Sequence, residues 1–175
     1  MAIVERWEYM PLASEDDPDD YRPESELAVI IDPARASGRF VEGMTVFDEK
    51  VAPGDRIPLH QHVVDEVLFV DEGRLEVTLG TESRVVEPRA VVFIPAGEEH
   101  GFRNVGEATA RIHAVFPARE IAIRYLERNP APGTEGDDAQ PPVAFDFREL
   151  LEGDPRTAVR RLSEADFPPA RASPS

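Results

Sequence analysis

The chain contains no cysteine among its 175 residues, which excludes disulfide bonds, thiolate metal ligands and a disulfide-stabilised secreted scaffold. Basic charge is scarce, because 19 Lys and Arg stand against 35 Asp and Glu, and the formal net charge is −16. Nucleic-acid and anionic-membrane partners need a basic face, so we expect neither. No apolar run approaches the length of a membrane span, and the first residues do not resemble a signal peptide. We therefore expect a cytoplasmic protein.

Histidine is also rare, yet three of the four histidines lie near one carboxylate at spacings that a metal site can use. His60 and His62 are two residues apart, and residues two apart in a strand point to the same face. Glu66 shares their parity and can join them from the next strand if a bend intervenes. His100 must come from a separate strand. Three imidazoles and a carboxylate suit a divalent first-row metal, so the pattern predicts a metal site with open positions.

Two longer motifs contain these four residues, and they resemble the two motifs of the cupin family. The first reads Gly, five residues, His-x-His, three or four residues, Glu, six residues, Gly, and every spacing is met by Gly54, His60, His62, Glu66 and Gly73. The second reads Gly, five residues, Pro-x-Gly, two residues, His, three residues, Asn, and it is formed by Pro95, Gly97, His100 and Asn104. Arg89 stands where the leading Gly belongs, and this departure concerns a turn between strands, not the metal ligands.

The resemblance implies an all-β cupin fold, a double-stranded β-helix or jelly-roll barrel. It also implies that one divalent transition metal per chain is held by His60, His62, Glu66 and His100. Iron is the first expectation, and Mn, Zn, Ni, Co and Cu are alternatives because the same ligands accept several ions. The expected partner is a small-molecule substrate or ligand. The family further suggests a homodimer, formed through the N-terminal strands or the C-terminal tail.

Composition divides the chain into four parts. Between about residues 40 and 116 the sequence reads as many short strands separated by turns, which is typical of an all-β sandwich or barrel. We expect an acidic arm at 1–26, the barrel at 27–128 with its motifs at 54–73 and 89–104, a linker at 129–142, and a short helical tail at 143–175 that packs on the barrel or on a partner. Residues 119–128 fit either a strand or a helix. Asp154 and Pro155 are typical of a helix start, and this helix is expected to extend to about Leu162.

Three further residues are candidates for chemistry. If His113 faces the cavity, it is a natural general acid or base, because the ordinary pKa of histidine lies near neutrality. The alternative is a histidine that faces outward or packs in the core. Arg56 and Arg103 flank the motifs and can bind a substrate carboxylate with two hydrogen bonds. Their alternative role is in surface ion pairs.

The ligand set favours a metal-dependent enzyme acting on a small organic molecule, with a mononuclear iron oxidoreductase of the dioxygenase type as the first interpretation. The alternative is a metal-dependent isomerase, lyase or cyclase, in which the ion polarises a carbonyl group. A third interpretation is a cupin that binds a small ligand without catalysis, since one fold serves many functions. Oxygen separates the first two, because a dioxygenase consumes it and an isomerase, lyase or cyclase does not need it.

Overall fold

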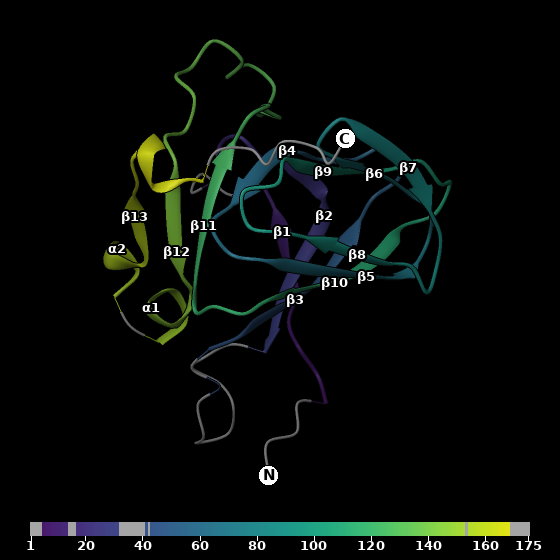
Figure 1. Ribbon diagram of the computed structural model, residues 1–175, viewed down its shortest axis with the longest axis horizontal. Helices are drawn as coiled ribbons and strands as arrows, with labels where there is room; N and C mark the ends of the chain where they lie inside the picture. The colour runs from purple at the N-terminus through teal and green to yellow at the C-terminus, as the bar shows by residue number, and fades with distance from the viewer. Residues whose placement is uncertain (1–4, 14–16, 32–40, 42, 153, 169–175) are drawn as a thin grey trace.

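The computed structural model describes residues 5–13, 17–31, 41, 43–152 and 154–168, and it confirms the expected all-β architecture (Figure 1). Within these residues two antiparallel sheets face each other, and helix is confined to short segments. The first sheet has six strands among the described residues, in the order β1 (Met10–Leu12), β2 (Arg22–Ile31), β3 (Thr45–Val51), β10 (Ala110–Phe116), β5 (Glu66–Glu72) and β8 (Val91–Ile94).

The second sheet has seven strands in the described part of the chain. Their order is β13 (Val159–Arg161), β12 (Val143–Asp146), β11 (Glu120–Tyr125), β4 (Arg56–His62), β9 (His100–Asn104), β6 (Leu75–Leu79) and β7 (Glu82–Val86). Strands β4 and β5 follow each other in the chain but belong to opposite sheets. The first motif therefore crosses from one layer to the other.

The alternation of side chains along β10 shows how the core forms between the sheets. Ala110, Ile112, Ala114 and Phe116 are buried on the inner face, and the residues between them are only half-buried. This period of two is the period of a strand with one face turned to the core. Inward side chains of both sheets form one hydrophobic cluster, which includes Leu68 of β5 and Leu75 of β6.

The acidic segment near the N-terminus is part of the barrel from Asp17 onward. Asp19, Asp20 and Arg22 belong to the expected acidic arm, but they expose only 0%, 7% and 3% of their surface, so this part of the arm is packed into the fold. The backbone is fastened to the loop after β11, where Tyr21 N donates to Asn129 O at 2.8 Å and Asn129 N donates to Asp19 O at 2.7 Å. Strand β2 then pairs with β3 and widens the first sheet.

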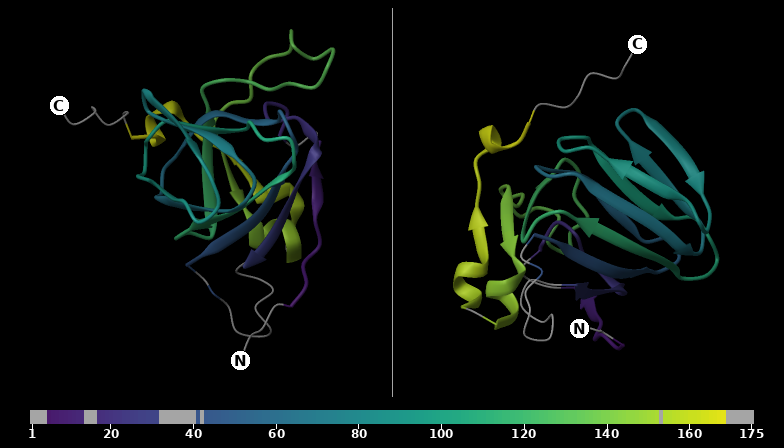
Figure 2. Two further views of the ribbon diagram at one scale, coloured as in Figure 1. Left: turned by 90° about the vertical axis from the view of Figure 1, so that its right-hand side faces the viewer. Right: turned by 60° about the horizontal axis from the view of Figure 1, so that its bottom comes forward.

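The C-terminal elements extend the second sheet at the edge formed by β11, as Figure 2 shows from two further directions. Residues 120–125 form a strand, which decides between the two expected structures, because β11 pairs with β4 on one side and β12 on the other. After β12 come α1 (Phe147–Glu152), α2 (Pro155–Ala158) and the 3-10 turn η1 (Glu164–Asp166). The Asp154 side chain caps α2 as the sequence indicates. The helix ends at Ala158 rather than near Leu162, because the next residues pair with β12 as β13.

The turn before β8 has an unusual backbone. Arg89 has a φ of 81°, and no other described non-glycine residue has a positive φ. Ala90 N donates to Glu87 O at 3.1 Å across the turn. Pro88 at the second position and a positive φ at the third are the features of a type II turn, whose third position favours glycine.

None of the described helices is long and apolar enough to cross a bilayer.

Candidate metal centre

Four buried side chains converge at the point where the two sheets meet near one end of the barrel. One ligand atom from each of His60, His62, Glu66 and His100 lies within 4.8 Å of the others. Glu66 Oε2 is 3.0 Å from His100 Nε2 and 3.6 Å from His62 Nε2. The structure thus brings together the four residues that the two motifs single out, as a cluster that could hold a metal ion.

Local strand geometry explains this convergence. His60 and His62 lie at the C-terminal end of β4. His100 is the first residue of β9, where it is the register partner of His60. The ring centroids of His60 and His100 are 4.1 Å apart. Residues 63–65 bend away from β4, and Glu66 begins β5 in the opposite sheet. The bend that the spacing requires is therefore present, and it lets a carboxylate face three imidazoles from the other layer.

Each imidazole is oriented by a backbone carbonyl. The Nδ1 atoms of His60, His62 and His100 lie 2.7, 2.7 and 2.9 Å from the carbonyl oxygens of Pro58, Ala122 and Glu98. A carbonyl oxygen can only accept a hydrogen bond, so each Nδ1 carries the proton. The Nε2 lone pair of each ring is then directed at the cluster, which is the arrangement found in histidines that ligate metals.

The electrostatics of the cluster also fit a cation. Burial lowers the pKa of His62 to about 4, even though the charge of Glu66 raises it, and burial with the two neighbouring imidazoles lowers the pKa of His60 well below its ordinary value. Both rings are therefore neutral near pH 7, and neutral imidazole is the form that binds metal. Glu66 is buried beside them, and a buried carboxylate is costly without a compensating charge. A divalent cation would supply that charge.

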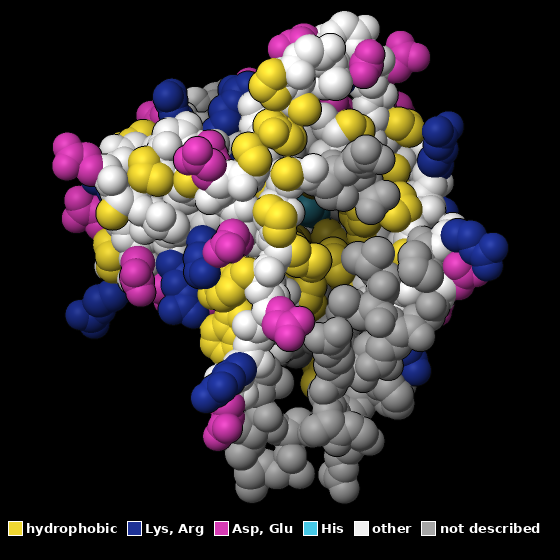
Figure 3. Space-filling model, turned by 180° about the vertical axis from the view of Figure 1, so that it is seen from behind, with side chains coloured by type: hydrophobic (Ala, Val, Ile, Leu, Met, Phe, Trp, Pro, Cys, Tyr) yellow, Lys and Arg dark blue, Asp and Glu magenta, His cyan; other side chains and the backbone are white. Residues whose placement is uncertain are grey.

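The cluster opens into a cavity of about 430 Å³ between the sheets. Its walls are mostly apolar and include Phe47, Ile57, Leu68, Phe102, Ile112 and Phe116. Figure 3 shows the hollow from behind, rimmed by hydrophobic side chains, with histidine visible inside it. A cavity of this size matches ligand sites for small organic molecules.

A second polar group lines the same cavity, and the motifs do not contain it. Its members are Asp17, Asp20, Arg22, Glu49 and Tyr125. Arg22 donates to both oxygens of Asp20, at 2.7 and 2.6 Å, and to Glu49. The Tyr125 hydroxyl donates to Asp17 Oδ2 at 2.8 Å. The one signal in the sequence was a single arginine, Arg22, inside an acidic run, and the structure shows that this charge is buried and paired.

The other candidate residues lie outside this cavity. His113 is on the outer face of β10, with Nε2 2.8 Å from Asp48 Oδ2 and Nδ1 in contact with Asp71. The orientation toward the cavity on which its catalytic role depended is therefore not met. Arg56 is exposed and forms an ion pair with Glu127 at 3.2 Å. Arg103 is exposed on β9 and is the register partner of Arg56.

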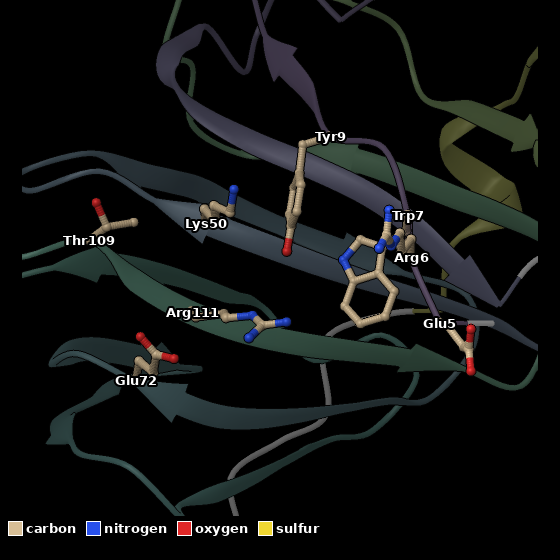
Figure 4. A pocket seen from close by; sticks show the side chains of 8 residues that line it. All are labelled: Glu5, Arg6, Trp7, Tyr9, Lys50, Glu72, Thr109 and Arg111. Atoms are coloured by element: carbon tan, nitrogen blue, oxygen red, sulfur yellow. The ribbon is translucent and has the colours of Figure 1, made fainter.

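A shallower hollow of about 610 Å³ lies on the outer face of the first sheet (Figure 4). Two of its cations, Lys50 and Arg111, are already engaged. Lys50 lies 3.5 Å from the centre of the Tyr9 ring, and Arg111 lies 5.9 Å from the centre of the Trp7 ring. Arg111 also donates hydrogen bonds to both carboxylate oxygens of Asp48, at 3.2, 3.0 and 2.7 Å. These contacts fasten the N-terminal segment to the sheet.

Known proteins share this fold and these motifs. A family model described as "Cupin domain" matches residues 47–116. The chain is 36% identical to polyketide synthase CurC of Streptomyces cyaneus over 95 residues, which are 54% of this chain and 56% of CurC. It therefore spans little more than half the length of that relative. It is 31% identical to protein SchB of Streptomyces halstedii over 65% of this chain and 79% of SchB.

A solved structure agrees with the architecture. The polyketide cyclase RemF of Streptomyces resistomycificus superposes with a TM-score of 0.60 at 21% identity, over 79% of this chain and 92% of RemF. This likeness concerns the fold. Two facing antiparallel sheets, the matched domain and the four converging ligand residues lead to one conclusion, that the chain belongs to the cupin family.

Proposed function

We propose that this protein is a metal-dependent cyclase acting on a small polyketide-like molecule. The observation that carries the proposal is the buried cluster of His60, His62, Glu66 and His100 at the wall of an apolar cavity. The name of CurC, a polyketide synthase protein, supports this class of substrate. RemF is an example of polyketide cyclisation carried by the same fold.

The residues present fit a divalent transition metal, because three Nε2 atoms and a carboxylate oxygen face one point. His60, His62, Glu66 and His100 would hold the ion. When bound, such an ion acts as a Lewis acid that polarises a carbonyl oxygen. The backbone carbonyls bonded to the three Nδ1 atoms keep the ligand atoms in place, so little reorganisation is needed when the site is filled.

The cavity walls do the rest of the binding. Apolar side chains from both sheets surround the cluster, and Phe116 packs edge-on against the ring of His62 with centroids 5.0 Å apart. A flexible polyketone folded in such a cavity has its reacting carbons brought together and water kept away. Among the described residues that line the cavity, the one arginine is Arg22, and it is already held by Asp20 and Glu49, so none is left for a substrate carboxylate. We therefore propose a neutral substrate.

This proposal reverses the order of the two enzyme interpretations. The ligand set alone favours the iron dioxygenase, with the cyclase among the alternatives. The relatives named above favour the alternative, and no feature of the described residues is specific to iron or dioxygen. Zinc, manganese and nickel suit a cyclase as well as iron does, since only a Lewis acid is required.

Heptane-2,4,6-trione is a suitable probe, because its cyclisation with loss of water gives 5-methylresorcinol. We would load the protein with Zn(II) or Fe(II) under nitrogen and follow this product by liquid chromatography. The proposal expects faster formation than in buffer with metal, without oxygen, and loss of the acceleration and of bound metal in His62→Ala. His113→Ala is the matched control, because it removes an imidazole from the outer face of the barrel.

Two other results would replace the proposal. Turnover that appears only with iron and oxygen would restore the dioxygenase interpretation. Binding of 5-methylresorcinol without turnover under any metal or oxygen condition would favour a non-catalytic binding protein.

The expected homodimer stays a prediction: β1 is an edge strand with Met10 exposed, and a monomeric mass by light scattering at micromolar concentration would contradict it.

A further inference from the structure

The cavity contains a carboxylate oxygen that has no partner among the described residues. Asp17 Oδ1 is buried and accepts no hydrogen bond from any described residue, although the side chain as a whole is only partly buried. The other oxygen, Oδ2, accepts the hydroxyl of Tyr125. A buried polar atom without a partner costs free energy, so it calls for a ligand or a function.

The neighbouring charged groups already have hydrogen-bond partners and do not need a ligand. Arg22 engages both oxygens of Asp20 and also binds Glu49, so these three side chains satisfy one another. Asp19 accepts from Arg128 at 2.5 Å and from the backbone of Gln140 at 2.8 Å. Asp17 is the carboxylate in this part of the cavity wall that the described contacts leave half-satisfied.

Tyr125 connects Asp17 to the ligand cluster. It is the register partner of His60 in the adjacent strand, and the two ring centroids are 6.0 Å apart. Its hydroxyl reaches from β11 to the N-terminal segment, 108 residues away in the chain. Tyr125 therefore lies between Asp17 and a ligand in this cavity that touches His60.

Burial, together with the charge of Asp20, raises the pKa of Asp17 to about 7, and the hydrogen bond from Tyr125 opposes the rise. The groups that face it are Asp19 and Asp20, which raise this pKa, and Arg22 and Tyr125, which lower it. A carboxylate with such a pKa exchanges a proton readily near neutral pH, as a general base must.

We propose that Asp17 is the proton-transferring residue of this cavity and that Tyr125 positions it. The inference rests on the proposed cyclase function. Asp17 Oδ1 takes a proton from a carbon adjacent to a carbonyl, and that carbon forms a bond to a second carbonyl carbon of the same molecule. The oxygen of the attacked carbonyl receives this proton and becomes a hydroxyl group. That hydroxyl then leaves as water together with a hydrogen from the neighbouring carbon. The sequence is redox-neutral and needs no co-reactant.

The test compares Asp17→Asn, Tyr125→Phe and the control Asp138→Asn, in which the same change is made at an exposed linker residue. All are loaded with the same metal and assayed with heptane-2,4,6-trione between pH 5 and 9. We expect Asp17→Asn to lower kcat roughly 100-fold or more. The wild-type rate should rise with pH through about 7, since the base must be deprotonated, and this limb should be absent in Asp17→Asn.

Tyr125→Phe separates positioning from mere packing. Removal of the hydroxyl takes away a hydrogen bond that lowers the pKa of Asp17, so the rising limb should move to higher pH. A structural role alone would lower the rate without moving the limb. Bound metal is measured in every variant and should equal that of wild type, since none of the three residues belongs to the ligand cluster.

The outcomes distinguish this inference from the proposed function. If wild type accelerates cyclisation and Asp17→Asn matches Asp138→Asn in rate and pH profile, the role of Asp17 is overturned and the cyclase stands. If wild type is inactive on the trione, binding of 5-methylresorcinol decides. Binding that Asp17→Asn weakens at least tenfold keeps Asp17 as the hydroxyl acceptor and overturns the cyclase. Equal binding by wild type and Asp17→Asn overturns both the role of Asp17 and the cyclase function.

Discussion

Replacing Arg89 with glycine should stabilise the protein. A left-handed backbone costs a residue with a Cβ about 1–2 kcal/mol, and Arg89 has a φ of 81°. Glycine removes that cost but adds about 0.5–1 kcal/mol of unfolded-state entropy. The net gain is up to about 1.5 kcal/mol, or a rise in Tm of up to about 6 °C for a domain of this size. Three hydrogen bonds of the turn are all made by the backbone, from Arg89 N to Val70 O, from Val70 N to Ala90 O and from Ala90 N to Glu87 O, so glycine keeps them.

Urea unfolding of wild type, Arg89→Gly and Arg89→Ala tests this reasoning. Arg89→Ala is the matched control, because it removes the same exposed side chain but keeps the Cβ that the turn disfavours. We expect its free energy of unfolding to stay within about 0.5 kcal/mol of wild type. An Arg89→Gly protein no more stable than Arg89→Ala would refute the argument, since the backbone strain would then contribute nothing measurable.

Three further predictions concern the core and the cavity. Leu75→Ala should lower the free energy of unfolding by about 2–5 kcal/mol in urea titrations, because Leu75 is fully buried. Zinc at about 100 times its Kd should stabilise wild type by about 2.7 kcal/mol, whereas His100→Ala should show no zinc-dependent shift in calorimetry. Because the pKa of Asp17 is raised from 3.8 to about 7, the folded state binds more protons than the unfolded state in that range, and stability falls as pH rises through it. Asp17→Asn should reduce this loss, whose upper limit is about 4 kcal/mol, and equal pH slopes of the two proteins between pH 4 and 8 would contradict the burial of this carboxylate.

Much of the site was open to prediction from the sequence because its geometry is local. Two histidines separated by one residue share a face in any strand, and a turn of three residues can bring Glu66 to the same point. His100 comes from the second motif, and its place at the start of a strand again defines where it lies. These relations depend on the period of a strand and not on long-range packing, which is why the cupin motifs indicate the four ligands.

Tertiary structure decided what depends on register and on distant partners. His113 could face either way until β10 was placed between β3 and β5, with Ile112 and Ala114 inward. Residues 120–125 became a strand because β12, far along the chain, pairs with them. The pairing of Tyr125 with Asp17 joins residues 108 positions apart, and no spacing rule reaches that far. The sequence by itself determined the four candidate ligands and the fold class through local periodicity, whereas the wall of the cavity was decided by contacts that exist only once the two sheets have closed around it.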